Sequence, residues 1–179
     1  MSDAEVLLKT GRFTVVRRQY ATADGKTHVR ESVQHPGAVV VLPLLAGGRV
    51  CLIRNYRSAV DQTLIELPAG TLEPDEDPRD TARRELEEET GFKAAAIEPL
   101  CQFFMSPGIL NERMHLFLAT GLAAGPTRLE AGEQIETCVV EWLEAVRMAE
   151  DGRIQDAKTL VGLFWYDRLR QKTSACQTT

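Results

Sequence analysis

The sequence lacks any hydrophobic run long enough to cross a bilayer. A spanning helix needs about 20 apolar residues, and no stretch of the 179-residue chain approaches that length. The N-terminal residues, MSDAEVLLKTGR, also contain no apolar signal-peptide core. We therefore expect a cytoplasmic protein that does not bind membranes.

Cysteine and histidine are scarce and are not spaced as metal ligands. The four cysteines are Cys51, Cys101, Cys138 and Cys176. They form no Cys-x-x-Cys pair, and three of them lie in apolar, strand-like runs, so we predict small buried thiols rather than zinc ligands or disulfides. The three histidines, at positions 28, 35 and 115, show no ligand spacing, and we interpret them as structural.

Positive charge is also in deficit, with 21 Lys and Arg against 26 Asp and Glu and a net charge of −5. This balance argues against a broad nucleic-acid surface, so we expect no nucleic-acid partner. If the ligand is an anionic phosphate ester, an acidic protein needs a cation between itself and that ligand.

The length suits one domain of mixed α/β class, mostly strands with helices packed on the sheets. Patterning predicts strands near residues 12–20, 27–34, 38–45, 49–56, 64–67, 97–105, 114–119 and 135–142. It predicts helices over residues 78–90 and 143–150 and from Asp156 onward. The residues expected on the apolar face of the last helix are Leu160, Leu163, Phe164 and Leu169.

The first of these helices carries Glu85, Glu88 and Glu89 on one face, at i, i+3 and i+4. Repulsion at this spacing costs roughly 0.2–0.5 kcal/mol per pair, and the C-terminal end of a helix disfavours anions. A solvated acidic face is the simpler interpretation. However, glycines bracket the helix and a tight Leu67-Pro68-Ala69-Gly70 turn precedes it, which favours a site for divalent cations such as Mg²⁺.

The segment from Gly70 to Phe92 resembles the Nudix box, the signature of the Nudix hydrolase family, G-x5-E-x7-R-E-U-x-E-E-x-G-U, in which U is apolar. The residues at the fixed positions are Gly70, Glu76, Arg84, Glu85, Leu86, Glu88, Glu89, Gly91 and Phe92. From average residue frequencies, a chance match is on the order of one in ten million. The resemblance implies the family's α/β/α sandwich, a mixed sheet plus antiparallel strands, with Mg²⁺ or Mn²⁺ as cofactor.

The same resemblance divides the chain into residues 1–34, an N-terminal β extension; 35–172, the Nudix hydrolase domain; and 173–179, a flexible tail. The extension exceeds what a minimal Nudix core needs. In similar pyrophosphatases such strands pack across a two-fold axis and complete the substrate pocket, so the resemblance implies a homodimer.

The family's metal ligands correspond here to Glu85 and Glu89, with Glu88 as a further ligand and the main-chain carbonyl of Ala69, which precedes the box glycine Gly70. Two other box residues, Arg84 and Glu76, are implied to support these carboxylates through ion pairs rather than to take part in the chemistry.

Residues outside the box resemble the ADP-ribose pyrophosphatase branch. Pro107 lies sixteen residues after Gly91, in the segment SPGILNE, although a Ser-Pro-Gly turn is common in ordinary loops. The resemblance implies that Arg57 contacts the pyrophosphate and Glu112 the terminal ribose. The alternatives are a surface salt bridge and an exposed loop charge. Arg30 is a further substrate-binding candidate, although arginines on strands are usually solvated.

Relatives place an acidic loop over the metals, and this loop corresponds to residues 125–135. It contains only Glu-Ala-Gly-Glu-Gln where many relatives have three or four clustered acidic residues. We favour Glu133 as the general base, with Glu130 and Glu136 as alternatives on or beside the loop and Glu85 as the second catalytic candidate.

The expected reaction is metal-dependent hydrolysis of ADP-ribose to AMP and ribose 5-phosphate, in which water attacks one phosphorus. A GDP-mannose or UDP-sugar pyrophosphatase is the nearest alternative. A non-catalytic nucleotide-sensing module is disfavoured because all box glutamates are kept. A hydrolase of damaged nucleoside triphosphates is disfavoured by the Ser-Pro-Gly segment and the N-terminal extension.

Overall fold

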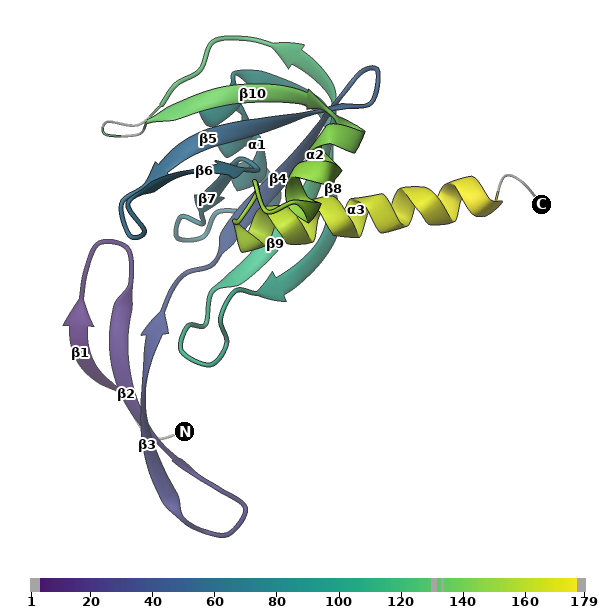
Figure 1. Cartoon of the computed structure of the whole chain (residues 1–179). Helices are drawn as coiled ribbons and strands as arrows, with labels where there is room; N and C mark the ends of the chain where they lie inside the picture. Colours follow the sequence, from purple (N-terminus) through teal and green to yellow (C-terminus); the bar gives the residue numbers. More distant parts are fainter. Residues whose placement is uncertain (1–3, 130–131, 133, 177–179) are drawn as a thin grey trace.

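The computed structural model describes residues 4–129, 132 and 134–176, which form two sheets and three helices (Figure 1). The strands are β1 (Glu5–Lys9), β2 (Thr14–Ala21), β3 (Thr27–Gln34), β4 (Ala38–Leu45), β5 (Arg49–Arg57), β6 (Gln62–Glu66), β7 (Ala69–Thr71), β8 (Phe92–Phe104), β9 (Arg113–Ala124) and β10 (Ile135–Glu141). The helices are α1 (Pro78–Thr90), α2 (Trp142–Glu150) and α3 (Ala157–Cys176).

The larger sheet has seven strands, ordered β10-β5-β4-β9-β8, with β6 paired to β5 and β7 paired to β4. Strands β4 and β9 run parallel, and the neighbouring pairs run antiparallel. Residues 38–43 of β4 are all buried, as an apolar strand covered on both faces should be. The expectation of a mixed sheet is confirmed.

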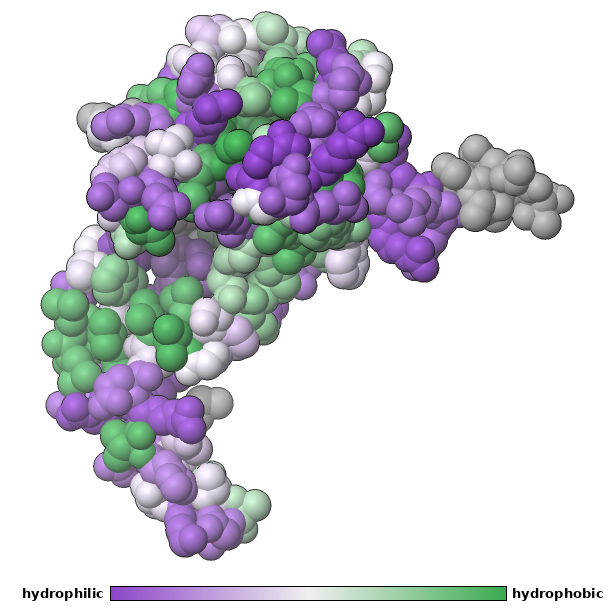
Figure 2. All heavy atoms as spheres, viewed as in Figure 1, coloured by the Kyte–Doolittle hydropathy of each residue, from purple (hydrophilic) through white to green (hydrophobic). Residues whose placement is uncertain are grey.

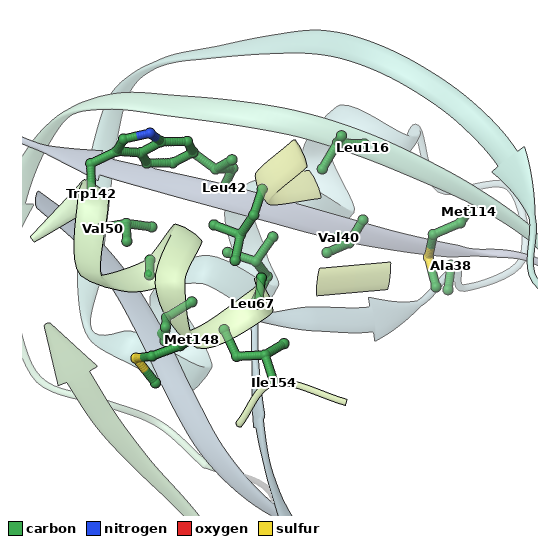
Figure 3. Close-up of a cluster of buried hydrophobic side chains, with 14 residues drawn as sticks. Ala38, Val40, Leu42, Val50, Leu67, Met114, Leu116, Trp142, Met148 and Ile154 are labelled. Atoms are coloured by element: carbon green, nitrogen blue, oxygen red, sulfur yellow. The ribbon is translucent and has the colours of Figure 1, made fainter. Parts of the chain in front are cut away.

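Helices cover both faces of this sheet. Because side chains alternate along a strand, Val39 and Val41 of β4 pack in a cluster with Leu86 of α1. Val40 and Leu42 point the other way, into a larger cluster to which α2 contributes Trp142 (Figure 3). The resulting α/β/α sandwich is the predicted fold.

Helix α1 has the predicted limits because both of its ends are capped. The Asp77 side chain accepts a hydrogen bond from the Arg79 amide at 2.8 Å, and Pro78 occupies the first turn. Gly91 ends the helix with a φ of 73°. A Cβ at this position would also lie 2.3 Å from the carbonyl oxygen of Gly125, so the stop requires glycine for two reasons.

Helix α3 differs from the prediction in its buried face. Leu163 is fully buried, but Phe164 and Leu169 are 44% and 38% exposed, so the expected apolar face is wrong at those two positions. Close approach decides the orientation, because a Cβ at Gly162 would lie 2.6 Å from Cδ1 of Leu67. The face directed at the sheet therefore includes residues 158, 159, 162 and 163, two of which are polar.

Helix α3 also continues to Cys176, past Thr173, where the sequence suggested that a tail begins. Between Gly162 and Cys176 the sequence has no further glycine and no proline, so no residue that commonly ends a helix is present. The last residues of the expected tail, 177–179, lie outside the described part of the chain.

Strands β1, β2 and β3 form a separate antiparallel sheet that projects from the body of the molecule (Figure 1). Strand β1 was not expected from the sequence, and all five of its residues are exposed. Val6 and Leu8 are 59% and 52% exposed, and hydrophobic atoms gather on this part of the surface (Figure 2).

Within the described residues, no helix is both long and apolar enough to cross a membrane. Cys51, Cys101 and Cys138 are free thiols on β5, β8 and β10. Cys51 is buried as predicted, whereas Cys101 and Cys138 are only partly buried, so the prediction of buried thiols is wrong for those two.

Candidate active site

Three carboxylates of the segment 70–92, those of Glu76, Glu85 and Glu88, are bonded to the guanidinium of Arg84. Nε and Nη2 of Arg84 donate to the two carboxylate oxygens of Glu76, each at 3.2 Å. Nη1 donates to Glu85 at 2.8 Å and to Glu88 at 3.1 Å. Arg84 therefore relieves the repulsion between Glu85 and Glu88 that the helical spacing creates.

These ion pairs shift the pKa values of their partners. The hydrogen bonds to Glu76 are the main reason that the pKa of Arg84 is raised above its ordinary value. The reciprocal hydrogen bonds hold the pKa of Glu76 below its usual value. Both residues therefore stay charged at neutral pH, and Glu76 remains an acceptor for Arg84.

Glu89 is directed at the loop before the box rather than at Arg84. Its side chain is nearly buried, at 3% exposure, and its Oε2 accepts a hydrogen bond from the Ala69 amide at 2.9 Å. Gly70 lies directly against the neighbouring carboxylate, because a Cβ there would fall 1.9 Å from Cδ of Glu85. Only glycine leaves room at position 70 for the Glu85 carboxylate.

The loop that carries Ala69 and Gly70 is held on its other side by the sheet. The Val41 amide donates to the Pro68 carbonyl at 2.9 Å, and residues 69–71 pair with β4 as β7. The structure thus brings the proposed ligands of α1 and the Ala69 main chain together, although residues 70–77 separate Ala69 from the start of the helix.

The donor set fits a hard divalent cation. Three carboxylates and a main-chain carbonyl supply only oxygen atoms, which Mg²⁺ and Mn²⁺ prefer. Among the residues that the structure describes, however, no three His, Cys, Asp or Glu side chains form a group ready to hold an ion. Arg84 donates to both Glu85 and Glu88, and Glu89 bonds to Ala69, so the carboxylates are occupied by other partners.

The loop expected to supply the general base is described only at its ends. Glu130 and Glu133 lie outside the described residues. On one side, the Arg128 amide donates to the Glu88 carbonyl at 2.9 Å, at the C-terminal end of α1. On the other, the Tyr56 amide donates to the Gln134 carbonyl at 3.4 Å, next to the end of β5.

Glu136, the alternative base, is described and lies on β10. It is exposed and stands opposite Arg54 of β5 in the antiparallel register. The register therefore places Glu136 beside a basic residue, which favours a charge pair on the sheet over a catalytic base.

Arg57, the expected pyrophosphate ligand, forms an ion pair with Glu66, a residue that was not predicted from the sequence to belong to the site. Its Nε and Nη2 donate to the two oxygens of Glu66 at 2.8 and 2.7 Å. The hydrogen bonds to Glu66 raise the pKa of Arg57, and the charge of Glu89 adds to this effect. Arg57 therefore lies within electrostatic reach of the box, and its side chain is 41% exposed.

Glu66 has a second cationic partner from the far end of the chain. Nζ of Lys158, in the first turn of α3, donates to Oε2 of Glu66 and, at 2.8 Å, to Asp156. A signal for this cluster exists in the sequence: Lys158 and Thr159 share a helix face with Gly162 and Leu163, an unusual position for polar residues unless they have buried partners.

The structure places Glu112 and Arg30 apart from α1. Glu112 is 18% exposed, with its carboxylate 3.5 Å from Nδ1 of His35. Nε of Arg30 donates to the hydroxyl of Tyr20 at 2.9 Å, on the projecting sheet. In a single chain, neither residue is shown in contact with the box.

The segment from Ser106 to Glu112 is tied to the strand that enters the body. The Val33 amide donates to the Ile109 carbonyl at 2.8 Å, and the Asn111 amide returns a bond to the Val33 carbonyl at 3.1 Å. Oδ1 of Asn111 accepts from the His35 amide at 2.7 Å. Hydrogen bonds thus connect β3 of the projecting sheet to the segment that resembles the ADP-ribose branch.

Comparison with known proteins decides the family. The model of the NUDIX domain matches residues 33–161, which include the whole box. The chain belongs to the Nudix family. It is therefore a Nudix hydrolase, as its filled box positions indicated.

The curated relatives with the named activities below are all pyrophosphatases. This Nudix chain is 39% identical to the ADP-ribose pyrophosphatase of Bacillus subtilis (strain 168) over 76% of its length and 75% of the relative's. It is 34% identical to the ADP-ribose pyrophosphatase of Mycobacterium tuberculosis, over 88% and 78%. A GDP-mannose pyrophosphatase of Yersinia enterocolitica is 35% identical over 70% of both chains.

A solved structure supports the fold of this Nudix hydrolase. The structure titled as that of an ADP compounds hydrolase superposes with a TM-score of 0.83 and covers 96% of this chain and 94% of its own, at 21% identity. Because that coverage includes nearly the whole chain, the likeness extends beyond the residues that the domain model matches.

Proposed function

We propose that the chain hydrolyses ADP-ribose to AMP and ribose 5-phosphate with the help of a divalent metal. The observation that carries the proposal is the arrangement of α1: Glu85 and Glu88 converge on Arg84, while Glu89 is bonded to the Ala69 amide. The choice of ADP-ribose is supported by the relatives at 39% and 34% identity that carry this activity in their names.

The residues that would hold Mg²⁺, or Mn²⁺ in its place, are Glu85, Glu88, Glu89 and the carbonyl of Ala69. When bound, the cation supplies positive charge against the diphosphate oxygens and makes water more acidic. Arg84 and Glu76 keep the helix carboxylates in place, and Gly70 leaves the space that Glu85 needs.

Three other residues complete the proposed site. Arg57 binds the diphosphate with the edge of its guanidinium that Glu66 does not use. Glu112 binds the terminal ribose, for which its position in the segment resembling the ADP-ribose branch is the support. Glu133 takes the proton of the attacking water, and this role is supported by the anchoring of Arg128 at Glu88 and of Gln134 at Tyr56 on either side of the loop.

The active unit proposed here is a homodimer formed through the projecting sheet. Val6, Leu7 and Leu8 are 40–59% exposed, and a contiguous apolar surface of this kind marks an interface more often than a solvated face. A second copy seated on this sheet would also place Arg30 against the partner subunit, where it could contact substrate, although within one chain it is not shown in contact with the box. The cytoplasmic location and the lack of nucleic-acid partners stay predictions from the sequence.

Hydrolysis of GDP-mannose is the second candidate, favoured by the relative at 35% identity. A panel of ADP-ribose, GDP-mannose and UDP-glucose, each assayed with Mg²⁺ and with Mn²⁺, separates the two. Release of AMP from ADP-ribose at the highest kcat/KM is expected. Faster release of GMP from GDP-mannose would replace the proposed substrate with the second candidate.

The metal assignment has its own test in the variants E85Q and E89Q. Each is expected to lower kcat by about 10²–10³-fold, because each removes a charge that acts in the transition state, while thermal unfolding stays cooperative. E98Q, at an exposed position on β8, is the matched control and should retain activity. Near-normal turnover of both E85Q and E89Q at saturating Mg²⁺ would show that α1 does not hold the metal.

A further inference from the structure

Glu66 is an unusual residue to find at its position. It ends β6, it is completely buried, and yet it carries a charge. A buried carboxylate is retained only when cations and hydrogen bonds compensate for its lost hydration. Two cations do so here, Arg57 from β5 and Lys158 from α3, and they share the Oε2 atom.

Lys158 is itself 7% exposed, so it is not a surface lysine that happens to reach a carboxylate. Its ammonium group is held between Glu66 and Asp156. Asp156 in turn accepts from the Thr159 amide at 2.9 Å and from the Thr159 hydroxyl at 2.6 Å, which fixes the first turn of α3.

The same turn also reaches the residue after Glu66. The Leu67 amide donates to the Thr159 hydroxyl at 2.8 Å. Lys158 and Thr159 of α3 therefore hold Glu66, the last residue of β6, and Leu67, which lies two residues before Ala69. The first turn of α3 therefore fixes the end of β6 and the residue that follows it, and we call this set of contacts from Lys158 and Thr159 the clamp.

This clamp determines the orientation of the Arg57 guanidinium, because it fixes Glu66. Glu66 occupies Nε and Nη2 of the guanidinium, and Nη1 makes no hydrogen bond with the part of the chain that the structure describes. Since Oε1 and Oε2 both accept from Arg57, a rotation of the Glu66 carboxylate would turn the guanidinium with it. Lys158 opposes that rotation from the buried side.

We propose that Lys158 is a positioning residue for substrate binding: through Glu66 it orients Arg57 so that Nη1 meets the diphosphate. The inference rests on the proposed function, because it takes Arg57 as a diphosphate ligand. Lys158 itself does not touch the substrate.

The test is a double-mutant cycle on the full chain, with R57A, K158M and R57A/K158M assayed for ADP-ribose hydrolysis at saturating Mg²⁺. Methionine keeps the length of the side chain and avoids a cavity. We expect K158M to raise KM about 10-fold, the lower end of the range for outer partners of site residues, with kcat within about threefold, because Arg57 binds ground and transition states alike. R57A/K158M should have the KM of R57A alone.

K172M is the matched control, because Lys172 lies on the same helix and is exposed. It should leave KM unchanged. A general weakening of the fold by K158M would lower the active fraction and thus kcat, and its effect would multiply with that of R57A. Either a KM for K158M within about twofold of the wild type or a multiplicative double mutant would overturn the inference.

A second measurement does not depend on how well K158M folds. In a crystal of the wild-type protein with a non-hydrolysable ADP-ribose analogue, Arg57 should keep both bonds to Glu66 while Nη1 contacts a phosphate oxygen. A guanidinium that leaves Glu66, or that stays away from the diphosphate, would contradict the inference. Wild-type protein that releases no AMP from ADP-ribose would instead refute the proposed substrate, which keeps the two failures distinct.

Discussion

The substitution E66Q probes the buried network most directly. It removes the only charge of Glu66 and leaves Lys158 paired with Asp156 alone, while Arg57 loses its bidentate partner. Breaking a buried ion pair by removing one partner costs about 3–5 kcal/mol. Asp156 still compensates Lys158, and Arg57, whose side chain is 41% exposed, can be hydrated. We therefore expect the lower end, about 3 kcal/mol at pH 7.

Urea and thermal unfolding followed by circular dichroism measure this loss. For a chain of this size 1 kcal/mol corresponds to about 2–4 °C, so Tm should fall by about 6–12 °C. The exposed E98Q serves again as the control for a change from glutamate to glutamine, and surface changes of this kind stay within about 0.5 kcal/mol. A loss below about 1 kcal/mol for E66Q would show that Glu66 is not a charged partner of both cations.

The pH dependence of the stability of E66Q checks the direction of the pKa shift of Glu66. Burial acts to raise the pKa of Glu66, but the hydrogen bonds from Arg57 and the charge of Lys158 outweigh it, so the folded-state pKa lies below the ordinary value of 4.5. A depressed carboxylate pKa contributes stability above the unfolded-state pKa and loses it as the pH falls through the folded-state value. The gap between wild type and E66Q should thus be full at pH 7 and narrow below about pH 4.5. A gap that stays constant down to pH 3 would contradict this account.

Two further predictions concern the end of α1 and the projecting sheet. G91A should destabilise the protein by about 2 kcal/mol in urea unfolding, because alanine disfavours a φ of 73° and its Cβ would meet the Gly125 carbonyl. G108A, at a position with no atom within 4 Å of the added Cβ, should change stability little, and equal losses for both would refute the steric argument. The double variant V6D/L8D should convert a dimer to a monomer in light scattering, whereas a wild-type protein that is already monomeric would refute the proposed interface.

Local signals made α1 predictable from the sequence. Asp77, Pro78 and Gly91 are residue types typical of helix ends, and they lie at or next to the ends of the helix, so its limits follow from local sequence. The carboxylate face follows from the helical period in the same way. The hydrogen-bond partners of Arg84 lie within eight residues of it, so its ion pairs with these carboxylates follow from local sequence, while its supporting role in the reaction stays a prediction.

Contacts over long sequence distances were not predictable in this way. Glu66 and Lys158 are separated by 92 positions, and neither has a local pattern that names the other. The apolar period of α3 likewise identified Phe164 and Leu169 but not which of its faces meets the sheet. That choice is made by the close approach of Gly162 to Leu67, and α3 extends beyond the body, where it is not covered (Figure 1).

The loop before α1 shows why the box is not sufficient to build the site. Its geometry is set from three directions: Glu89 of α1 bonds to the Ala69 amide, β4 bonds to the Pro68 carbonyl, and Thr159 of α3 bonds to the Leu67 amide. Only the first of these involves a residue of the signature, Glu89. A transplanted box would therefore carry the carboxylates and their Arg84 partner but not the constraint on the Ala69 carbonyl. Because a metal site tolerates little error in the position of its ligands, the proposed site of this chain depends on the sheet and the start of α3 as well as on the glutamates.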